Sequence, residues 1–396
     1  MLEASNLQVL KKGTFMIKKD YDLVTSLLEK LQRTDLSKIK MLIGFDGFVD
    51  EVLYVVDKRW NAIEYQRLVY MKDYAKKIMQ GAGLSINVEM VVVQQKLGGN
   101  GTILANSLAV MGCDITYAGA IGHTMLHPVF QEMAEKCRLI SLADPAFTDA
   151  IEFVDGKIIS SKLDNLNQVT WKRILERLGI EGLRQLIVES DVIGFENWTM
   201  LVAMTDIWKH LLVEVLPGIV SNTKEKLLFI DLADPEKRKP EDLLEALMLL
   251  GEFSNYFNVI LGLNKKEANE IARLYGYSYE NRQDNDTMEQ AQFLKQKIHI
   301  DTLVIHPVKE ACAVKNTEAF YVEGPYCKCP KLVTGAGDNF NAGFLLGQVI
   351  GCTLEEALIL GTANSGFYVR NARSAEIPEL CQFISDWKRN GLFSEK

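Results

Sequence analysis

A glycine-rich turn that carries one acid stands late in the chain, at Gly335-Ala336-Gly337-Asp338. Glycine permits tight turns, and the residues that follow, through Ile350, have helix-compatible spacing. We therefore expect the backbone amides of Gly335, Ala336 and Gly337 to gather at a helix N-terminus and to form an anion hole. A carboxylate beside these amides would repel phosphate, but it could accept the proton of a hydroxyl that attacks a phosphate.

Two other interpretations of this turn compete with phosphoryl transfer. Asp338 stands where a plain helix cap would stand. A dinucleotide-binding turn would need a third glycine at the position that Phe340 occupies, and Asp338 would repel a pyrophosphate. The turn therefore favours a kinase with Asp338 as general base over a dehydrogenase. At its usual pKa of about 3.9 this aspartate would be a weak base that takes the proton late in the reaction.

The composition describes a chain with a large core and an acidic surface. The chain has 396 residues, of which 48% are hydrophobic, and its formal net charge is −8. This charge argues against nucleic acid or an anionic membrane as the main partner, and we find neither a long apolar span nor a signal peptide. Seven scattered cysteines fit reduced thiols, so we expect a cytoplasmic protein.

The order of apolar segments predicts an α/β fold. Residues 1–40 are expected to form a helical extension, and residues 41–396 a single domain with a doubly wound, mostly parallel central sheet and helices on both faces. The strands expected in the second half are 187–195, 227–231, 258–263 and 302–306. The helices expected there are 200–215, 241–250, 265–275, 287–298, 338–350 and 354–370.

Two aspartates follow the first expected strand. Asp46 and Asp50 come after Met41-Leu42-Ile43-Gly44, at an edge where parallel strands place ligands. Either carboxylate could accept hydrogen bonds from sugar hydroxyls, and either could serve a turn instead.

A second glycine-rich turn, Gly98-Gly99-Asn100, precedes an apolar helix that we expect to end at Gly112. Its glycines would let a substrate approach the backbone closely. Further on, Asp155-Gly156 between two apolar runs predicts a β-hairpin, either a lid over the acceptor or an ordinary edge hairpin.

Acidic residues also follow two later strands. Asp231 could approach magnesium or its waters, or could serve a turn. Asn264 and Glu267 have the spacing of a helix capping box, which alone would explain the pair.

The stretch from Gly335 to Phe344 resembles the C-terminal signature of the ribokinase-like (PfkB) carbohydrate kinases, and Gly98 to Gly112 resembles their first signature. This resemblance implies ATP and Mg²⁺ as cofactors, with Asp338 as the base and a small sugar or sugar-like alcohol as the acceptor. It further implies that Asn264 and Glu267 position magnesium. It places Asp50 nearer than Asp46 to the acceptor-gripping position.

The resemblance also implies a small β lid made from parts of about 45–60, 90–97, 113–122 and 148–162. Lid hairpins of this family often pair between subunits, which suggests a homodimer.

The chain departs from the family pattern at several positions. Ile103 replaces an expected asparagine, so polar contacts with the acceptor must come from elsewhere, with Asn100 and Asn106 as options. Leu332 and Val333 replace the residues of a monovalent-cation site, which argues against activation by potassium. His306-Pro307 replaces a glycine-rich turn of the nucleotide pocket, and Asn364 is a further candidate for nucleotide contact. The alternatives left open are a nucleoside kinase and a catalytically silent nucleotide- or sugar-binding protein.

Overall fold

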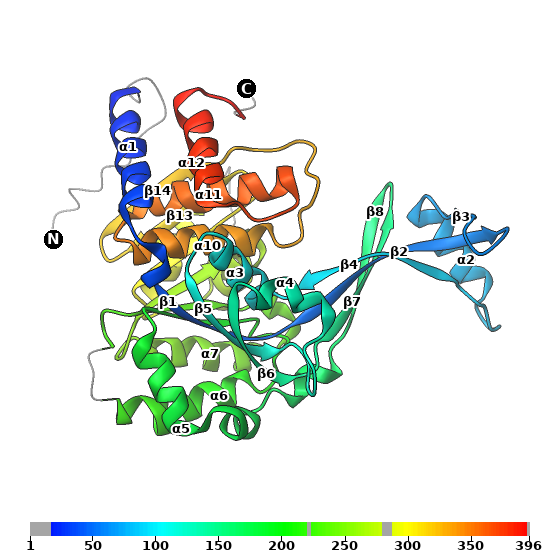
Figure 1. Ribbon diagram of the computed structural model, residues 1–396, viewed down its shortest axis with the longest axis horizontal. Coiled ribbons are helices and arrows are strands. Elements are labelled where there is room, and N and C mark those ends of the chain that lie inside the picture. Colours follow the sequence, from blue (N-terminus) through cyan, green and yellow to red (C-terminus); the bar gives the residue numbers. More distant parts are fainter. Residues whose placement is uncertain (1–16, 220–222, 279–286, 394–396) are drawn as a thin grey trace.

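The structure is a computed structural model that describes residues 17–219, 223–278 and 287–393. Within these ranges the body is a nine-stranded sheet covered by helices on both faces, and a smaller β-sheet projects from it as an arm (Figure 1). None of the described helices is long and apolar enough to span a membrane.

The large sheet is parallel except at one edge. Its strands β1, β5, β6, β9, β10, β11 and β12 pair in parallel, while β13 and β14 continue the sheet in antiparallel fashion. In spatial order the strands are β14 (Glu318–Glu323), β13 (Glu310–Lys315), β12 (Thr302–Ile305), β11 (Asn258–Leu263), β10 (Leu227–Asp231), β9 (Val192–Glu196), β1 (Lys40–Phe45), β5 (Asp114–Ala120) and β6 (Cys137–Ala143).

Two hydrophobic cores fill the spaces between this sheet and its helices. The inner strands are buried on both faces and are therefore apolar almost throughout, whereas the edge strands β14 and β6 are partly exposed. One core is closed by α5 (Trp171–Glu189), α6 (Met204–His210), α7 (Pro240–Phe253), α8 (Lys265–Leu274) and α9 (Thr287–Lys297). The other is closed by α1 (Ile17–Arg33), α3 (Asn100–Val110), α4 (Gln131–Ala134), α10 (Ala336–Val349), α11 (Leu354–Asn371) and α12 (Ile377–Ile384).

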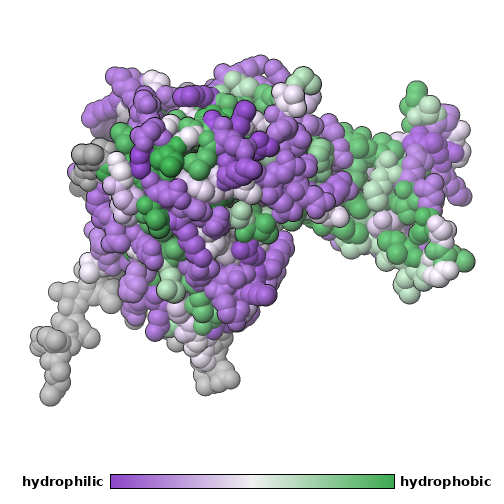
Figure 2. Space-filling view, turned by 90° about the horizontal axis from the view of Figure 1, so that it is seen from below, coloured by the Kyte–Doolittle hydropathy of each residue, from purple (hydrophilic) through white to green (hydrophobic). Residues whose placement is uncertain are grey.

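The arm is a lid built around one long strand. Strand β2 (Phe48–Arg59) pairs antiparallel with β4 (Met90–Gly98) and parallel with β7 (Ala146–Phe153), which forms a hairpin with β8 (Gly156–Lys162). The far end of β2 pairs with β3 (Tyr65–Arg67), and α2 (Met71–Gln80) packs there on a small apolar cluster. Figure 2 shows that apolar residues remain exposed along this arm.

The expected doubly wound sheet is confirmed, and the hairpin predicted at Asp155-Gly156 is present between β7 and β8. Two expectations are wrong. The segment 113–122 was assigned to the lid, but β5 lies inside the large sheet between β1 and β6, where its side chains are buried on both faces. The strand expected from residue 187 begins only at Val192, because residues 187–189 form the end of α5 and Ile187 packs on its buried face.

The N-terminal extension is described from residue 17 onward, and its first sixteen residues lie outside the described part. Helix α1 buries Val24, Leu27 and Leu31 in the second core and lies beside α12 (Figure 1). The Lys30 ammonium contacts the Glu356 carboxylate of α11 at 2.6 Å, which ties the extension to the body.

Candidate active site

Asp338 lies in the first turn of α10, at the wall of a cavity of about 1710 Å³ between the body and the lid. Gly335 caps this helix with a φ of 91°, a left-handed conformation that glycine adopts without strain. A Cβ atom on Gly335 would lie 2.8 Å from the Tyr368 hydroxyl. The turn therefore needs glycine both for its conformation and for its close packing.

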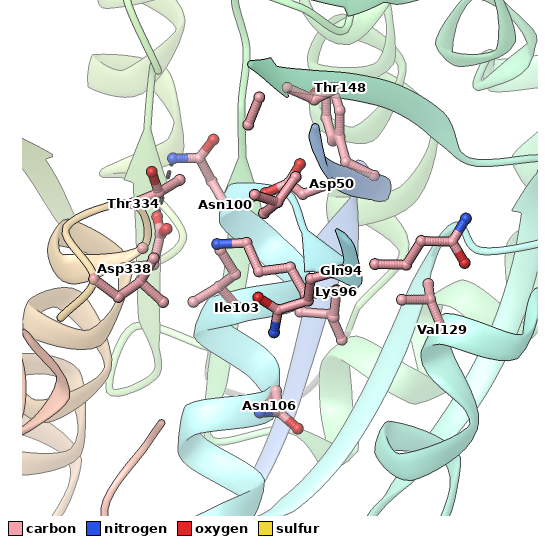
Figure 3. A pocket seen from close by; sticks show the side chains of 18 of the residues that line it. Asp50, Gln94, Lys96, Asn100, Ile103, Asn106, Val129, Thr148, Thr334 and Asp338 are labelled. Carbon is pink, nitrogen blue, oxygen red and sulfur yellow. Dashed lines mark hydrogen bonds between the residues drawn. The ribbon is translucent and has the colours of Figure 1, made fainter. Parts of the chain in front are cut away.

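The Asp338 carboxylate is buried and receives one hydrogen bond from another signature. Its Oδ1 accepts from the Asn100 side-chain amide at 2.9 Å (Figure 3). Burial, together with the negative charges of Asp46, Glu267 and Asp50, raises the pKa of Asp338 to about 8. The sequence-based expectation of an ordinary aspartate is thus wrong, because an isolated residue type carries no information about its desolvation. A carboxyl with this pKa is a much better proton acceptor once it is ionised.

The structure separates the roles of the two early aspartates. Asp46 is fully buried and accepts hydrogen bonds from the amides of Asn100 and Gly101, the Tyr117 hydroxyl and the Asn197 side chain. It therefore holds the start of α3 in place and is not one of the residues that line the cavity. Its prediction as a direct contact of the acceptor has no support in this geometry.

Asp50, in contrast, lines the cavity from β2 (Figure 3). Burial raises the pKa of its carboxyl, an effect that the charges of Lys96 and Lys157 and a hydrogen bond from Thr148 oppose. A Cβ atom on Gly98 would lie 2.3 Å from the Asp50 Oδ1 atom. Any side chain at position 98 would therefore clash with the Asp50 carboxylate, so this position needs glycine.

Gly99 packs against the other early aspartate, Asp46. It precedes α3 with a φ of 103°, and a Cβ atom there would lie 3.0 Å from Asp46 Oδ2. In the second glycine-rich turn, Gly98 therefore packs against the Asp50 carboxylate and Gly99 against the Asp46 carboxylate. The next residue, Asn100, donates a hydrogen bond to Asp338.

A second acidic group lies at the carboxyl ends of β10 and β11. Asp231 is buried and accepts from the Asn341 side chain at 3.0 Å, while Glu267 accepts from the amides of Asp234 and Asn264, each at 2.9 Å. The Asn264 side chain in turn accepts a hydrogen bond from the Glu267 backbone amide, so the capping box predicted from the sequence is present at the start of α8.

Burial and the charge of Glu267 raise the pKa of Asp231 well above its usual value. A magnesium ion brought with a nucleotide would relieve this repulsion, and oxygen donors of this kind suit it. No group of three or more acidic, histidine or cysteine side chains in the described part has the arrangement of a complete metal site.

The prediction that Asn364 contacts the nucleotide has no support in this geometry. The residue is fully buried, and its amide donates to Ser107 Oγ at 3.1 Å and to the Asn339 carbonyl at 2.7 Å. It joins α11 to α3 and α10. Its position on a helix with small and apolar neighbours is the signal of an interior contact that the sequence-based prediction overlooked.

Among the cavity residues that the sequence analysis did not identify are Lys96 on β4 and Thr148 on β7. Both lie beside Asp50 in the register of the lid sheet. The alternation of side chains along β4 could have indicated that Lys96 shares a face with Gly98. The pairing of β4 with β2, which brings Lys96 beside Asp50, could not be predicted from the sequence.

Comparisons with known proteins agree with this arrangement. The family model of prokaryotic ketohexokinases matches residues 22–387. A ketohexokinase of Haloferax volcanii is 27% identical over 350 residues, which cover 88% of this chain and 91% of the relative. A carbohydrate kinase from Agrobacterium tumefaciens superposes with a TM-score of 0.59 at 19% identity, over 88% of this chain and 97% of that one. A ribokinase from Thermotoga maritima gives a TM-score of 0.55 at 15% identity, over 88% and 99%.

The fold and the comparisons define a ribokinase-like carbohydrate kinase, which transfers a phosphoryl group from ATP to an alcohol group of a sugar. Within that class, the chain belongs to the prokaryotic ketohexokinase family, whose model spans nearly its whole length. The resemblance drawn from the two glycine signatures is confirmed.

We predict that Asp338→Asn lowers kcat about 10²- to 10⁴-fold, the range of general-base catalysis, because asparagine cannot accept the hydroxyl proton. The folded protein binds a proton at Asp338 up to about pH 8, whereas the unfolded chain releases it near pH 4. Stability contributed by this group is therefore lost as pH rises between these values. The melting temperature of Asp338→Asn should be higher than that of the wild type, and this difference should be larger at pH 8 than at pH 5. Differential scanning calorimetry would measure both values.

Asp338→Glu is the matched control for this variant, because it keeps a titratable acid at the same place. A wild-type kcat in Asp338→Asn would exclude Asp338 as the base. A melting-temperature difference independent of pH would contradict its raised pKa.

We predict that Gly98→Ala raises the KM for the acceptor about tenfold or more and leaves the KM for ATP unchanged, because the new methyl group displaces the Asp50 carboxylate. Initial rates with each substrate varied in turn would measure both constants. Gly182→Ala is the control, because no atom lies within 4 Å of a Cβ atom at that position. Equal changes in both KM values would show a general distortion instead.

Proposed function

We propose that this enzyme phosphorylates a hydroxyl of a ketohexose, with ATP as the donor. Membership of the prokaryotic ketohexokinase family and the 27% identity to a ketohexokinase support this acceptor. The single observation that carries the proposal is the buried Asp338 at the wall of the cavity, held by Asn100 and facing the same space as Asp50.

The cavity also favours an acceptor without a phosphate of its own. Four of its cationic side chains already have carboxylate partners: Lys136 with Glu132 at 3.0 Å, Lys157 with Glu152 at 3.1 Å, Lys237 with Asp234 at 3.2 Å, and Arg373 with Glu379 at 2.5 Å. A phosphorylated sugar would have to compete with these carboxylates for its counter-charges.

In the proposed reaction the acceptor oxygen forms a bond to the γ-phosphorus of ATP while the bond to the β,γ-bridging oxygen breaks. ADP leaves with that electron pair, and Asp338 takes the hydroxyl proton. The amides of Gly335, Ala336 and Gly337 stabilise the charge on the transferring group. Asp50 accepts a hydrogen bond from another acceptor hydroxyl and so orients the sugar.

Magnesium would supply charge neutralisation along the phosphate chain. In our proposal Glu267 and Asp231 hold this ion, directly or through its waters, and Asn264 fixes Glu267 through the capping box. Their buried negative charges give a reason to bind a cation.

The enzyme is further proposed to be cytoplasmic and to form a homodimer through the lid. The seven cysteines are free thiols, which fits a reducing compartment. The cavity-facing side of the lid continues outward with Val93 and Ile159, whose side chains are 42% and 56% exposed. A second lid would cover these residues.

The expected acceptor can be tested with a panel of ketohexoses, aldohexoses, sugar phosphates and nucleosides, each with ATP and Mg²⁺. We expect the highest kcat/KM with a ketohexose, measured by ADP release and by phosphate transfer to the sugar. Preference for a nucleoside would overturn the proposal. Chelation of magnesium should abolish turnover, and potassium should not raise it, because Leu332 and Val333 occupy the expected cation-site positions.

We predict that Val93→Glu together with Ile159→Glu converts the dimer to a monomer, because the charges would be buried against the second lid. Analytical ultracentrifugation would measure the mass. The control is Val213→Glu, an equally simple change at a valine of the body that is 75% exposed. A monomeric wild type would contradict the proposed dimer.

A further inference from the structure

Four polar residues form one continuous row across the lid sheet. The strand register aligns Lys96 of β4 with Asp50 of β2, Asp50 with Thr148 of β7, and Thr148 with Ser161 of β8. All four side chains line the cavity. We call Lys96, Asp50, Thr148 and Ser161 the lid row.

The residues on either side of the lid row are mostly apolar or lack a side chain. Nearer the body, the same face carries Phe48 paired with Gly98 and with Ala146. On the outward side it carries Val52 paired with Ala150, and Ala150 paired with Ile159. The polar exception among these neighbours is Gln94, which pairs with Val52. A carboxylate as buried as that of Asp50 is not needed for the folding of the sheet. Burying Asp50 in fact costs free energy, as its raised pKa shows.

The lid row offers a defined order of hydrogen-bonding groups. Lys96 can only donate and Asp50, when ionised, can only accept, while the hydroxyls of Thr148 and Ser161 can do both and lie 3.3 Å apart. Neighbouring hydroxyls of a sugar present a donor and an acceptor in the same way.

Lys96 is the member of the row that remains available to a ligand. None of the ion pairs of the described residues includes Lys96, and its attraction to Asp50 acts at longer range. Burial lowers the pKa of its ammonium, so the group has lost part of its hydration. A ligand oxygen would restore a hydrogen bond that the folded protein does not provide.

The body side of the cavity leaves a place for such a donor. Helix α3 presents Ile103 beside Asn100, and the Asn100 side chain is already engaged with Asp338 (Figure 3). The apolar Ile103 side chain cannot hydrogen-bond a hydroxyl. The lid supplies a donor on the opposite side of this space, because Lys96 lines the same cavity.

We propose that Lys96 is a specificity-determining residue of the acceptor site, whose ammonium donates a hydrogen bond to the acceptor hydroxyl next to the one that Asp50 binds. This inference rests on the proposed kinase function and adds the contact by which the lid recognises an uncharged polyol. Because Lys96 and Asp50 both stand on lid strands, the lid carries a recognition element as well as a cover that excludes water.

The test compares Lys96→Met with the wild type on the preferred sugar and on its monodeoxy analogues. We expect the variant to raise the KM for the sugar roughly 10- to 100-fold, the worth of a hydrogen bond to a charged group, while the KM for ATP stays unchanged. One deoxy analogue should lose a similar factor with the wild type and less than threefold with Lys96→Met. If every analogue loses the same factor in both proteins, Lys96 does not contact the acceptor.

Two further variants separate contact from indirect effects. Lys157→Met removes another lid lysine of the same cavity, one paired with Glu152, and should change the acceptor KM less than threefold. In an Asp50→Asn background, Lys96→Met should still raise the acceptor KM. If it does not, Lys96 acts only by keeping Asp50 ionised, and the inference falls.

Melting temperatures identify any variant that fails to fold, and Lys96→Arg, which keeps the charge and a donor, should recover most of the lost affinity. Failure of Lys96→Arg to recover affinity in a folded protein would count against the contact. If the wild type transfers phosphate to no sugar, the proposed function itself fails. An active wild type with an unaffected Lys96→Met overturns this inference alone.

Discussion

The burial of carboxylates at one edge of the sheet is the constraint on which the rest of the site depends. Asp46, Glu196, Asp231, Glu267 and Asp338 are all buried near the carboxyl ends of parallel strands. Burial removes most of the hydration of these carboxylates, so each negative charge needs hydrogen bonds or a nearby cation. Asparagine side chains donate hydrogen bonds to three of these carboxylates, from Asn197 to Asp46, from Asn341 to Asp231 and from Asn100 to Asp338.

These pairs link elements that are far apart in the sequence. Asn341 of α10 reaches Asp231 at the end of β10, and Asn100 of α3 reaches Asp338 of α10. The Asp338 carboxylate is thereby fixed relative to both glycine-rich turns. The compensation is nevertheless incomplete, because neither carboxylate oxygen of Glu196 has a hydrogen-bond partner among the described residues. Burial and three neighbouring acids raise the pKa of Glu196 well above its usual value.

In the proposed reaction the body and the lid divide the chemistry between them. The body contributes the groups that act on the phosphate, at helix N-termini and strand ends that a packed core holds rigid. The lid contributes Asp50 and its neighbours from strands that pack less against the core. Recognition of the acceptor can thus change through the lid while the phosphoryl-transfer groups remain fixed.

The sequence by itself determined those features that depend on neighbours along the chain. The apolar strands, the turn at Asp155-Gly156, the glycine-rich helix starts and the cap formed by Asn264 and Glu267 are all set by local backbone chemistry. Only the tertiary structure decided how buried a side chain is and which strand lies beside it. Burial gave Asp338 its raised pKa, and strand register placed Lys96 beside Asp50. Neither desolvation nor pairing across a sheet is a property of a short segment, because both arise from residues distant in sequence.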